Sequence, residues 1–116
     1  MKNRNKDSTR FYSEKQEEHV AKALGGFRTA NSGAGKFSAG DVVVPSASLL
    51  VECKTCMSEK DSFSIKKEWW DKNRLEAFEK RLSNRALVFN WGPDTENVYI
   101  ISEELMQYLI TKLEEV

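Results

Sequence analysis

The chain has 116 residues, a length that suits one domain with a single hydrophobic core. Charged residues make up 31% of it and hydrophobic residues 40%, the balance of an ordinary globular protein. No apolar run approaches the roughly 20 residues of a membrane-spanning helix, and no hydrophobic segment follows the basic N-terminus. We therefore expect a cytoplasmic protein with no membrane partner.

Charge is balanced over the whole chain but not along it. The 18 basic and 18 acidic residues give a net charge of zero, yet residues 1–40 carry eight basic and four acidic side chains. The tail from Glu103 is acidic instead. Because local patches rather than net charge decide affinity for phosphates, the basic N-terminal third fits a DNA substrate.

The first forty residues predict an arm, a helix, a short strand and a loop. Residues 1–11 are polar and basic, so we expect a flexible arm ahead of a single domain over residues 12–116. A helical pattern runs from Ser13 to Leu24, where two glycines end it. A short strand over residues 27–30 and a loop rich in Gly and Ser over residues 31–40 follow.

The next segment predicts a β-hairpin. Asp41 opens a strand over residues 42–44, a turn follows, and a second strand runs from Ser48 into Glu52. Side chains alternate between the two faces of a strand, so Glu52 and Lys54 project from the same face. The hairpin is expected to bring Asp41 close to Glu52, with Lys54 beside them.

The C-terminal half is expected to complete an α/β sandwich. A long helix is predicted from residue 63 or 65 to Leu82, then a buried strand over residues 86–91, a strand over residues 98–101 and a helix capped by Ser102. Candidate buried positions on the long helix are Trp69, Trp70, Leu75, Phe78 and Leu82. The order is helix, three strands, helix, two strands, helix, which predicts a mixed central sheet flanked by helices.

Two carboxylates and a lysine at one spot are what a divalent metal and an attacking water require. Asp41 and Glu52 are candidate ligands for Mg²⁺, which prefers octahedral oxygen coordination and keeps several waters. Lys54 is a candidate for orienting the water and offsetting negative charge in the transition state. The alternative is a set of solvated surface charges, but the apolar strand around Glu52 favours a metal-dependent nuclease.

Glu17 is the third candidate acid. It lies at helical spacing from the apolar residues Val20, Ala21 and Leu24, so it shares the buried stripe of its helix. The neighbouring Glu18 is rotated about 100° away from this stripe. A carboxylate on a core-facing stripe is costly without a partner, and a metal would supply one. We therefore expect Glu17 to support metal or water placement.

Cys53 and Cys56 form a Cys-x-x-Cys pair. A zinc site needs two further thiol or imidazole ligands, and the sequence holds one histidine, His19. A thioredoxin-type pair begins a helix, whereas Cys53 lies inside a predicted strand. We expect Cys53 to be a core thiol and assign no disulfide.

These motifs, in this order, resemble the PD-(D/E)XK nuclease superfamily, and more narrowly the small Holliday junction resolvases of archaea and their phage-encoded relatives. The resemblance covers about residues 12–110 and rests on Ser13, Gln16-Glu17, Val20-Ala21, Leu24-Gly25-Gly26, Ser32-Gly33-Ala34, Gly40-Asp41-Val42, Glu52-Cys53-Lys54-Thr55, Ser64–Trp69 and the strand over residues 86–91. Gly40 stands where the superfamily name has proline, and glycine is common there in the phage-type members. The resemblance implies a restriction-endonuclease-like αβββαβ core.

The resemblance also implies an activity. The family cuts four-way DNA junctions as a homodimer by Mg²⁺-dependent phosphodiester hydrolysis, and it leaves 5′-phosphate and 3′-hydroxyl ends. Mn²⁺ is the expected substitute metal, and no organic cofactor is expected. The catalytic residues implied are Glu17, Asp41, Glu52 and Lys54, and the backbone carbonyl of Cys53 would be a further metal ligand. If the chain is phage-encoded, its location is the cytoplasm of the host cell.

Contacts with DNA are expected on both sides of these catalytic residues. From the sequence alone the loop that holds Ser32 and Gly33 is a plain linker, but the resemblance implies that it grips the scissile phosphate through hydroxyl and backbone N–H groups. The basic candidates for phosphate contacts are Lys36, Arg28, Arg10 and Lys66. Gln16 and Thr55 would line the site behind the catalytic residues.

Three other functions stay open. The same chemistry could act on nicked, flapped or duplex DNA, because substrate choice depends on loop and dimer geometry. The chain could be a catalytically silent DNA-binding module, although the complete catalytic set argues against that. It could also bind a protein partner through the final helix, where Leu105, Leu109 and Leu113 form an apolar stripe.

Overall fold

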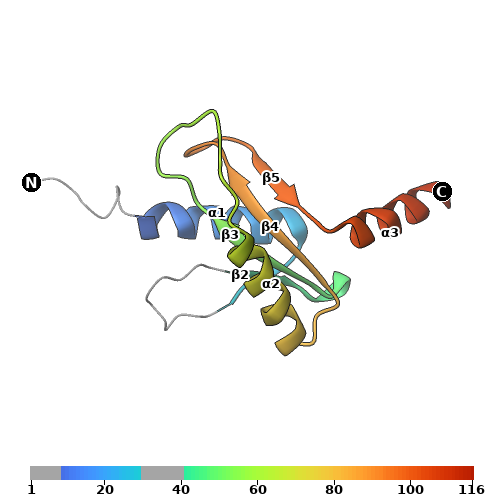
Figure 1. The fold of residues 1–116 in the computed structure, drawn as a ribbon. Coiled ribbons are helices and arrows are strands. Elements are labelled where there is room, and N and C mark those ends of the chain that lie inside the picture. Colours follow the sequence, from blue (N-terminus) through green and yellow to red (C-terminus); the bar gives the residue numbers. More distant parts are fainter. Residues whose placement is uncertain (1–8, 30–40) are drawn as a thin grey trace, which may run out of the picture.

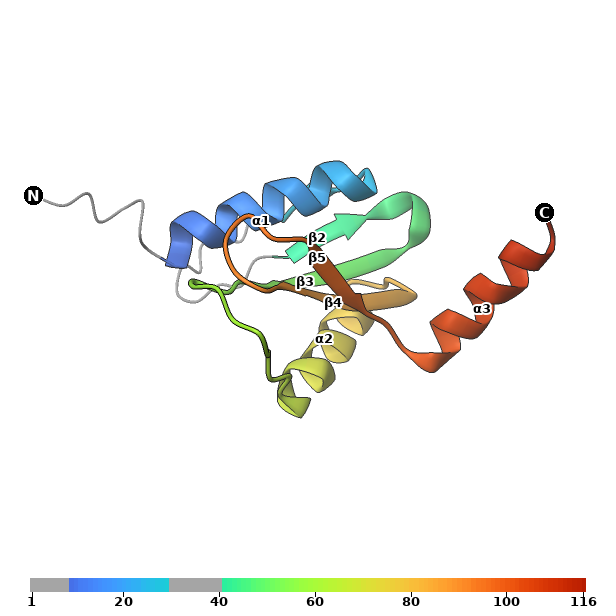
Figure 2. The ribbon, with the colours of Figure 1, turned by 90° about the horizontal axis from the view of Figure 1, so that it is seen from above.

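A five-stranded mixed sheet forms the centre of the protein, as the sequence predicted. The computed structural model describes residues 9–29 and 41–116. The strands lie in the order β1-β2-β3-β4-β5. Helix α1 covers one face of the sheet and α2 the other, while α3 extends beyond the edge (Figures 1 and 2). The α/β class is therefore confirmed.

The order of helices and strands is also the predicted one. The elements are, in chain order, α1 (Thr9–Leu24), β1 (Phe27–Arg28), β2 (Asp41–Val44), the 3₁₀ turn η3 (Pro45–Ala47), β3 (Leu49–Lys54), α2 (Lys67–Glu79), β4 (Asn84–Asn90), β5 (Asn97–Ile100) and α3 (Glu103–Glu114). No helix within the described part of the chain has the length and apolar character needed to cross a bilayer.

Two helix boundaries differ from the prediction. Helix α1 begins at Thr9, so the last residues of the expected arm are helical, and the rest of that arm lies outside the described residues. Helix α2 begins only at Lys67. Phe63 lies in the segment before the helix, where its ring stacks on the ring of Phe89 with 4.5 Å between the centroids. The helix ends at Glu79, ahead of Arg81, whose φ of 60° is left-handed and cannot continue an α-helix.

The sheet combines a hairpin with a crossover. Strands β2 and β3 are antiparallel, and the short η3 turn between them ends at Ser48, which has a left-handed φ of 50°. Strands β3 and β4 are parallel and are joined through α2, while β4 and β5 are antiparallel. Because β3 and β4 are central, both of their faces are covered and their side chains are mostly buried.

The two faces of the sheet bury different side chains. The face under α1 holds the larger apolar cluster, which contains Val20, Ala21, Val42, Val44, Val51, Cys53, Ala86 and Val88. The face under α2 holds a smaller cluster of Val43, Leu50 and Ala77, with Leu82 partly buried against it. Asp41, Glu52 and Lys54 share this second face, because they alternate with the valines of the first.

The predicted buried face of α2 is wrong in part. Leu75 and Phe78 are 56% and 78% exposed, and the residues of α2 that are buried are Asn73 and Ala77. The periodicity of the sequence identified an apolar stripe on α2 but did not show whether that stripe faces the sheet or the solvent. The small side chain of Ala77 meets the sheet and lets the helix approach closely, whereas the bulky stripe faces outward.

Helix α3 packs differently from the other two helices. Ser102 caps it as predicted, since its hydroxyl accepts a hydrogen bond from the backbone N–H of Leu105 at 3.1 Å. The helix contains no buried residue, and Leu109 and Leu113 are exposed. Within this chain the apolar stripe is therefore a surface rather than part of the core.

Candidate active site

Three carboxylates converge between the sheet and α2. Asp41 and Glu52 are direct partners across the β2–β3 hairpin, as the sequence predicted, and both face α2. Glu76 approaches them from α2. One carboxylate oxygen from each of Asp41, Glu52 and Glu76 lies within 4.8 Å of the other two.

Two of these carboxylates have oxygens that the described residues leave unsatisfied. Glu52 is 1% exposed, and its Oε2 contacts Lys54 Nζ at 3.0 Å. Its Oε1 and the Oδ1 of Asp41 are buried and have no hydrogen-bond partner among the described residues. Burying an unpaired carboxylate oxygen is costly, so the arrangement calls for a cation or a donor.

The pKa of Asp41 reflects the same environment. Burial raises the pKa of this carboxyl to about 7, and the negative charges of Glu76 and Glu52 act in the same direction. Lys80 and Lys72 oppose the shift. A divalent cation among the carboxylates would reverse the effect of the like charges and favour the ionised form.

The ammonium group of Lys54 is held in a fixed position. Its Nζ lies 3.0 Å from Glu52 Oε2 and 4.3 Å from the centroid of the Trp69 ring. Phe63 lies between Trp69, at 6.3 Å, and Phe89, at 4.5 Å between ring centroids. The Lys54 side chain is 19% exposed, and the Trp69 ring covers one side of its ammonium, which limits solvation and strengthens the electrostatic effect of the charge on nearby atoms.

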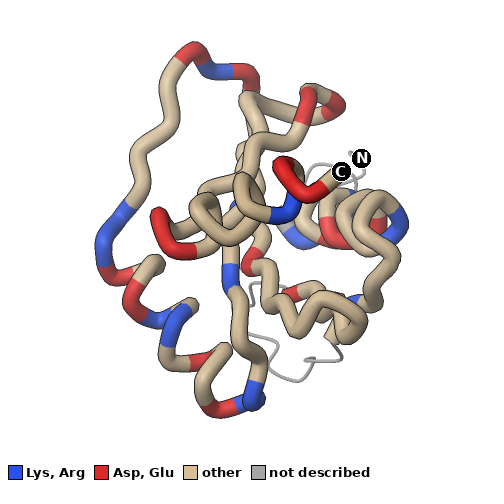
Figure 3. The backbone as a smooth tube through the Cα atoms, turned by 90° about the vertical axis from the view of Figure 1, so that its right-hand side faces the viewer, with Lys and Arg blue, Asp and Glu red and all other residues tan. Residues whose placement is uncertain are grey.

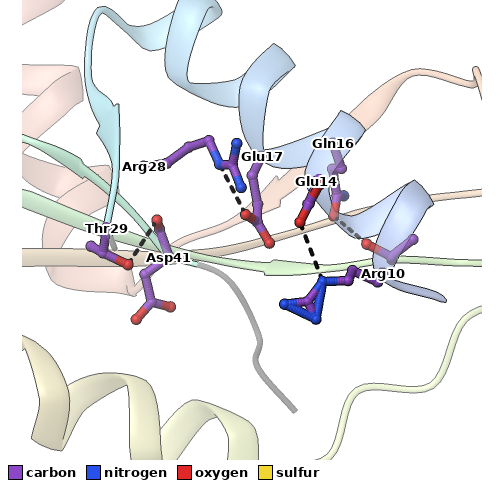
Figure 4. Close-up of polar contacts among 8 residues, drawn as sticks. Arg10, Glu14, Gln16, Glu17, Arg28, Thr29 and Asp41 are labelled. Atoms are coloured by element: carbon purple, nitrogen blue, oxygen red, sulfur yellow. Dashed lines mark hydrogen bonds and ion pairs between the residues drawn. The ribbon is translucent and has the colours of Figure 1, made fainter. Parts of the chain in front are cut away.

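Glu17 is buried as predicted, but it lies apart from the three carboxylates. Its Oε1 accepts a hydrogen bond from Arg28 Nε at 3.2 Å, whereas Glu18 is exposed. Burial raises the pKa of Glu17, and Arg28 opposes that shift. Figure 4 shows this pair beneath α1, with the Asp41 carboxylate pointing away from it.

Gln16 and Thr55 connect α1 to the end of β3. Gln16 Nε2 donates to the backbone oxygen of Lys54 at 3.2 Å and to Asn97 Oδ1 at 3.2 Å. Thr55 Oγ1 donates to Gln16 Oε1 at 2.9 Å. This network fixes the backbone that carries Lys54.

Both cysteines are buried, and both are free in the structure. Cys53 points into the apolar cluster under α1, as predicted. Burial raises the pKa of its thiol, with Glu17 acting in the same direction. A neutral thiol on the opposite face cannot serve as a ligand, so the backbone carbonyl is the group that Cys53 could offer.

The expected DNA contacts are only partly described. Ser32, Gly33 and Lys36 lie outside the described residues. Arg28 pairs with Glu17, and Arg10 pairs with Glu14 at 3.4 Å. Along the backbone of α2, Lys and Arg residues are interspersed with Asp and Glu (Figure 3).

Sequence reasoning missed Glu76 and Asn73. Asn73, Glu76 and Ala77 have the spacing of one helix face. Asn73 is fully buried, and its Nδ2 donates to the backbone oxygen of Ala86 at 3.3 Å. The available signal was the helical spacing of these small and polar residues, but the prediction followed the bulkier residues on the other side of the helix.

No family model, curated protein or solved structure matches this chain.

Proposed function

We propose that the protein is a metal-dependent endonuclease of the PD-(D/E)XK type, with a restriction-endonuclease-like αβββαβ core, that cleaves four-way DNA junctions. The observation that carries the proposal is the pair Asp41 and Glu52, adjacent across a hairpin, with buried unpartnered oxygens beside Lys54. The ordered resemblance of the motifs supplies the junction substrate.

The donor set fits a hard divalent cation. Asp41 and Glu52 offer carboxylate oxygens, and the backbone carbonyl of Cys53 offers another oxygen on the same strand as Glu52. All-oxygen coordination suits Mg²⁺ or Mn²⁺ rather than zinc or copper. These residues would hold the metal, which when bound stabilises charge on the phosphate and lowers the pKa of water.

Lys54 would act directly in the hydrolysis. Its ammonium, fixed by Glu52 and the Trp69 ring, would orient the attacking water and offset negative charge on the phosphate oxygens. The water oxygen forms a bond to phosphorus as the bond to the 3′-oxygen breaks. The leaving oxygen gains a proton, which gives a 3′-hydroxyl and a 5′-phosphate.

A homodimer would match the symmetry of the substrate, since a junction presents equivalent phosphates related by a two-fold axis. We propose that α3 supplies the interface with a second copy. A cavity of about 540 Å³ lies between α2 and α3, and Phe78, Leu82, Leu105 and Tyr108 contribute its apolar lining. Arg74, Arg85 and Glu104 also line it, and the two arginines are opposite in charge to Glu114 and Glu115 at the end of α3.

The dimer is tested by charging the apolar stripe. Leu109→Glu is expected to convert a dimer into a monomer in sedimentation equilibrium, because it places a carboxylate in an apolar interface. Gln107→Glu adds the same charge elsewhere on α3 and is the matched control. A monomeric wild-type protein, or a dimer that survives Leu109→Glu, would contradict this interface.

The activity is tested with a labelled four-way junction and a linear duplex of matching sequence, each with and without Mg²⁺. Paired, metal-dependent nicks near the branch point, with the duplex intact, are the expected result. Cutting of the duplex would keep the nuclease and remove the junction specificity. Binding without cutting would support the silent DNA-binding module instead.

A further inference from the structure

We propose that Glu76 is the third carboxylate ligand of the metal centre, so that α2 rather than α1 completes the site. The inference rests on the proposed function for the metal itself and adds a ligand that the motifs did not indicate. Its basis is the convergence of Glu76 with Asp41 and Glu52, within 4.8 Å between oxygens.

The partners of Glu76 leave room for a cation. Its described ion pair is with Lys72, one turn earlier on α2, at 3.5 Å between Lys72 Nζ and Glu76 Oε2. Lys72 is mostly exposed, and exposed pairs of this kind contribute little. The carboxylate therefore faces two other carboxylates with only weak compensation from a surface lysine.

An independent observation points to a ligand at the same place. Glu52 is almost completely buried, and its Oε1 has no hydrogen-bond partner among the described residues although its Oε2 is held by Lys54. The buried Oδ1 of Asp41 also has no hydrogen-bond partner among the described residues. A cation bound by Glu76 would satisfy both oxygens and remove the repulsion among the three acids.

The position of Glu76 is fixed by its helix. Ala77 packs against Val43 and Leu50 of the sheet, and Asn73 is tied to the backbone of Ala86. These two contacts set both the rotation of α2 and its distance from the sheet. Glu76 lies between them in the sequence and is thereby held over the hairpin.

Glu17 does not occupy an equivalent position. It is paired with Arg28 under α1, at 3.2 Å between Arg28 Nε and Glu17 Oε1, and it is not among the three carboxylates that converge at Asp41. In Figure 4 the Asp41 carboxylate points away from Glu17. The carboxylate on α1 is therefore neutralised by an arginine, and the carboxylate on α2 faces the metal ligands.

The test is the affinity of the full-length protein for Mn²⁺, measured from the free-ion signal in electron paramagnetic resonance. Glu76→Gln is expected to weaken binding by about 10-fold or more. Glu79→Gln, an exposed change on the same helix, and Glu17→Gln are expected to leave the affinity unchanged. Asp41→Asn and Glu52→Gln alter the two ligands already proposed, and both are expected to lose Mn²⁺ binding.

The outcomes separate the inference from the proposed function. Unchanged affinity in Glu76→Gln, with binding lost in Asp41→Asn and Glu52→Gln, would overturn the role of Glu76 alone. Weaker binding in Glu17→Gln but not in Glu76→Gln would assign the third ligand to α1. Unchanged affinity in all three ligand variants would refute the metal centre itself.

A thermal measurement guards against misfolding. Mn²⁺ is expected to raise the Tm of the wild-type protein by mass action, and Glu76→Gln is expected to reduce that rise. The metal-free Tm of Glu76→Gln should equal or exceed that of the wild type, because the variant removes a like charge. A lower metal-free Tm would show that Glu76 is structural and would contradict its assignment as a ligand.

Discussion

The two faces of the central sheet are made by alternate residues of the same strands, yet their chemistry is opposite. Val51 and Cys53 point into the apolar cluster under α1. Glu52, between them, points toward α2 and meets Asp41 and Lys54. Adjacent positions on one strand thus contribute to a dry core and to a charged site.

The difference shows how this small domain divides stability from function. The α1 face buries the larger apolar cluster, and the buried carboxylate of Glu17 on that face is compensated by Arg28. The α2 face buries fewer apolar side chains and leaves carboxylate oxygens of Asp41 and Glu52 unpartnered among the described residues. We infer that the α1 face stabilises the fold. The carboxylates on the α2 face lower the stability of the metal-free protein and provide the ligands for a cation.

The largest effect expected is on catalysis by Glu52→Gln. Removing this charge should slow junction cutting at least about 100-fold, because both the cation and Lys54 lose their partner. The free energy of unfolding in EDTA should change little, because removal of a buried charge offsets loss of the ion pair with Lys54. Cleavage assays and urea denaturation of the same variant measure the two quantities.

Val51→Ala is the reciprocal control on the neighbouring residue. Val51 is fully buried on the α1 face, so truncation should lower the free energy of unfolding by about 2 kcal/mol. The cleavage rate of the folded fraction should be unchanged. Stability lost in Glu52→Gln, or activity lost in Val51→Ala, would contradict the division between the two faces.

The next largest effect is expected on the stability of the metal-free protein, which should depend on pH. The pKa of Asp41 is raised from 3.8 to about 7, chiefly by burial, so the folded protein holds this proton more tightly than the unfolded chain. The resulting contribution to stability is fully present below about pH 4 and is lost as pH rises through about 7. We expect a loss of about 2 kcal/mol, smaller than the full shift implies because the carboxyl keeps some contact with solvent.

Urea denaturation in EDTA across this pH range measures the effect, and Asp41→Asn should remove most of it. A smaller slope of the same sign should remain, because burial also raises the pKa of Glu17. An unaltered slope in Asp41→Asn would assign the titration to other groups. Saturating Mn²⁺ should flatten the slope in the wild-type protein, because ligation favours the ionised carboxylate.

Much of the site could be predicted because a hairpin constrains its residues locally. The short turn fixes the register, and alternation then places Asp41, Glu52 and Lys54 on one face. Similar reasoning correctly predicted that Glu17 is buried, since Val20 and Ala21 define the buried side of α1, although Glu17 is not among the three converging carboxylates. In both cases neighbours in sequence determine which side is inside.

The orientation of α2 could not be predicted in this way. Its apolar stripe, with Leu75 and Phe78, is the stronger signal by periodicity, but the sheet face opposite α2 combines the carboxylates of Asp41 and Glu52 with buried apolar residues. The residues of α2 that are buried against this face are Asn73 and Ala77, whereas Leu75 and Phe78 are exposed. Glu76 was missed for this reason, because its position depends on the opposing face and not on its own neighbours.

The smallest effect expected comes from Arg28→Met, which tests whether the α1 face is independent of the metal centre. Methionine keeps much of the apolar stem but removes the donor to Glu17, whose carboxylate is then buried without compensation. The free energy of unfolding at neutral pH should fall by about 1 kcal/mol, a modest value because Arg28 is partly exposed.

The loss should be smaller at acidic pH than at neutral pH, because protonation neutralises Glu17, whose pKa is raised by burial, and the neutral carboxyl no longer needs the guanidinium. Urea denaturation at the two pH values measures this change. Mn²⁺ affinity should remain that of the wild type, because Glu17 and Arg28 lie on the opposite face from Glu76. An altered affinity would mean that the charge of Glu17 reaches the metal through the sheet, and the two faces would then function as one site.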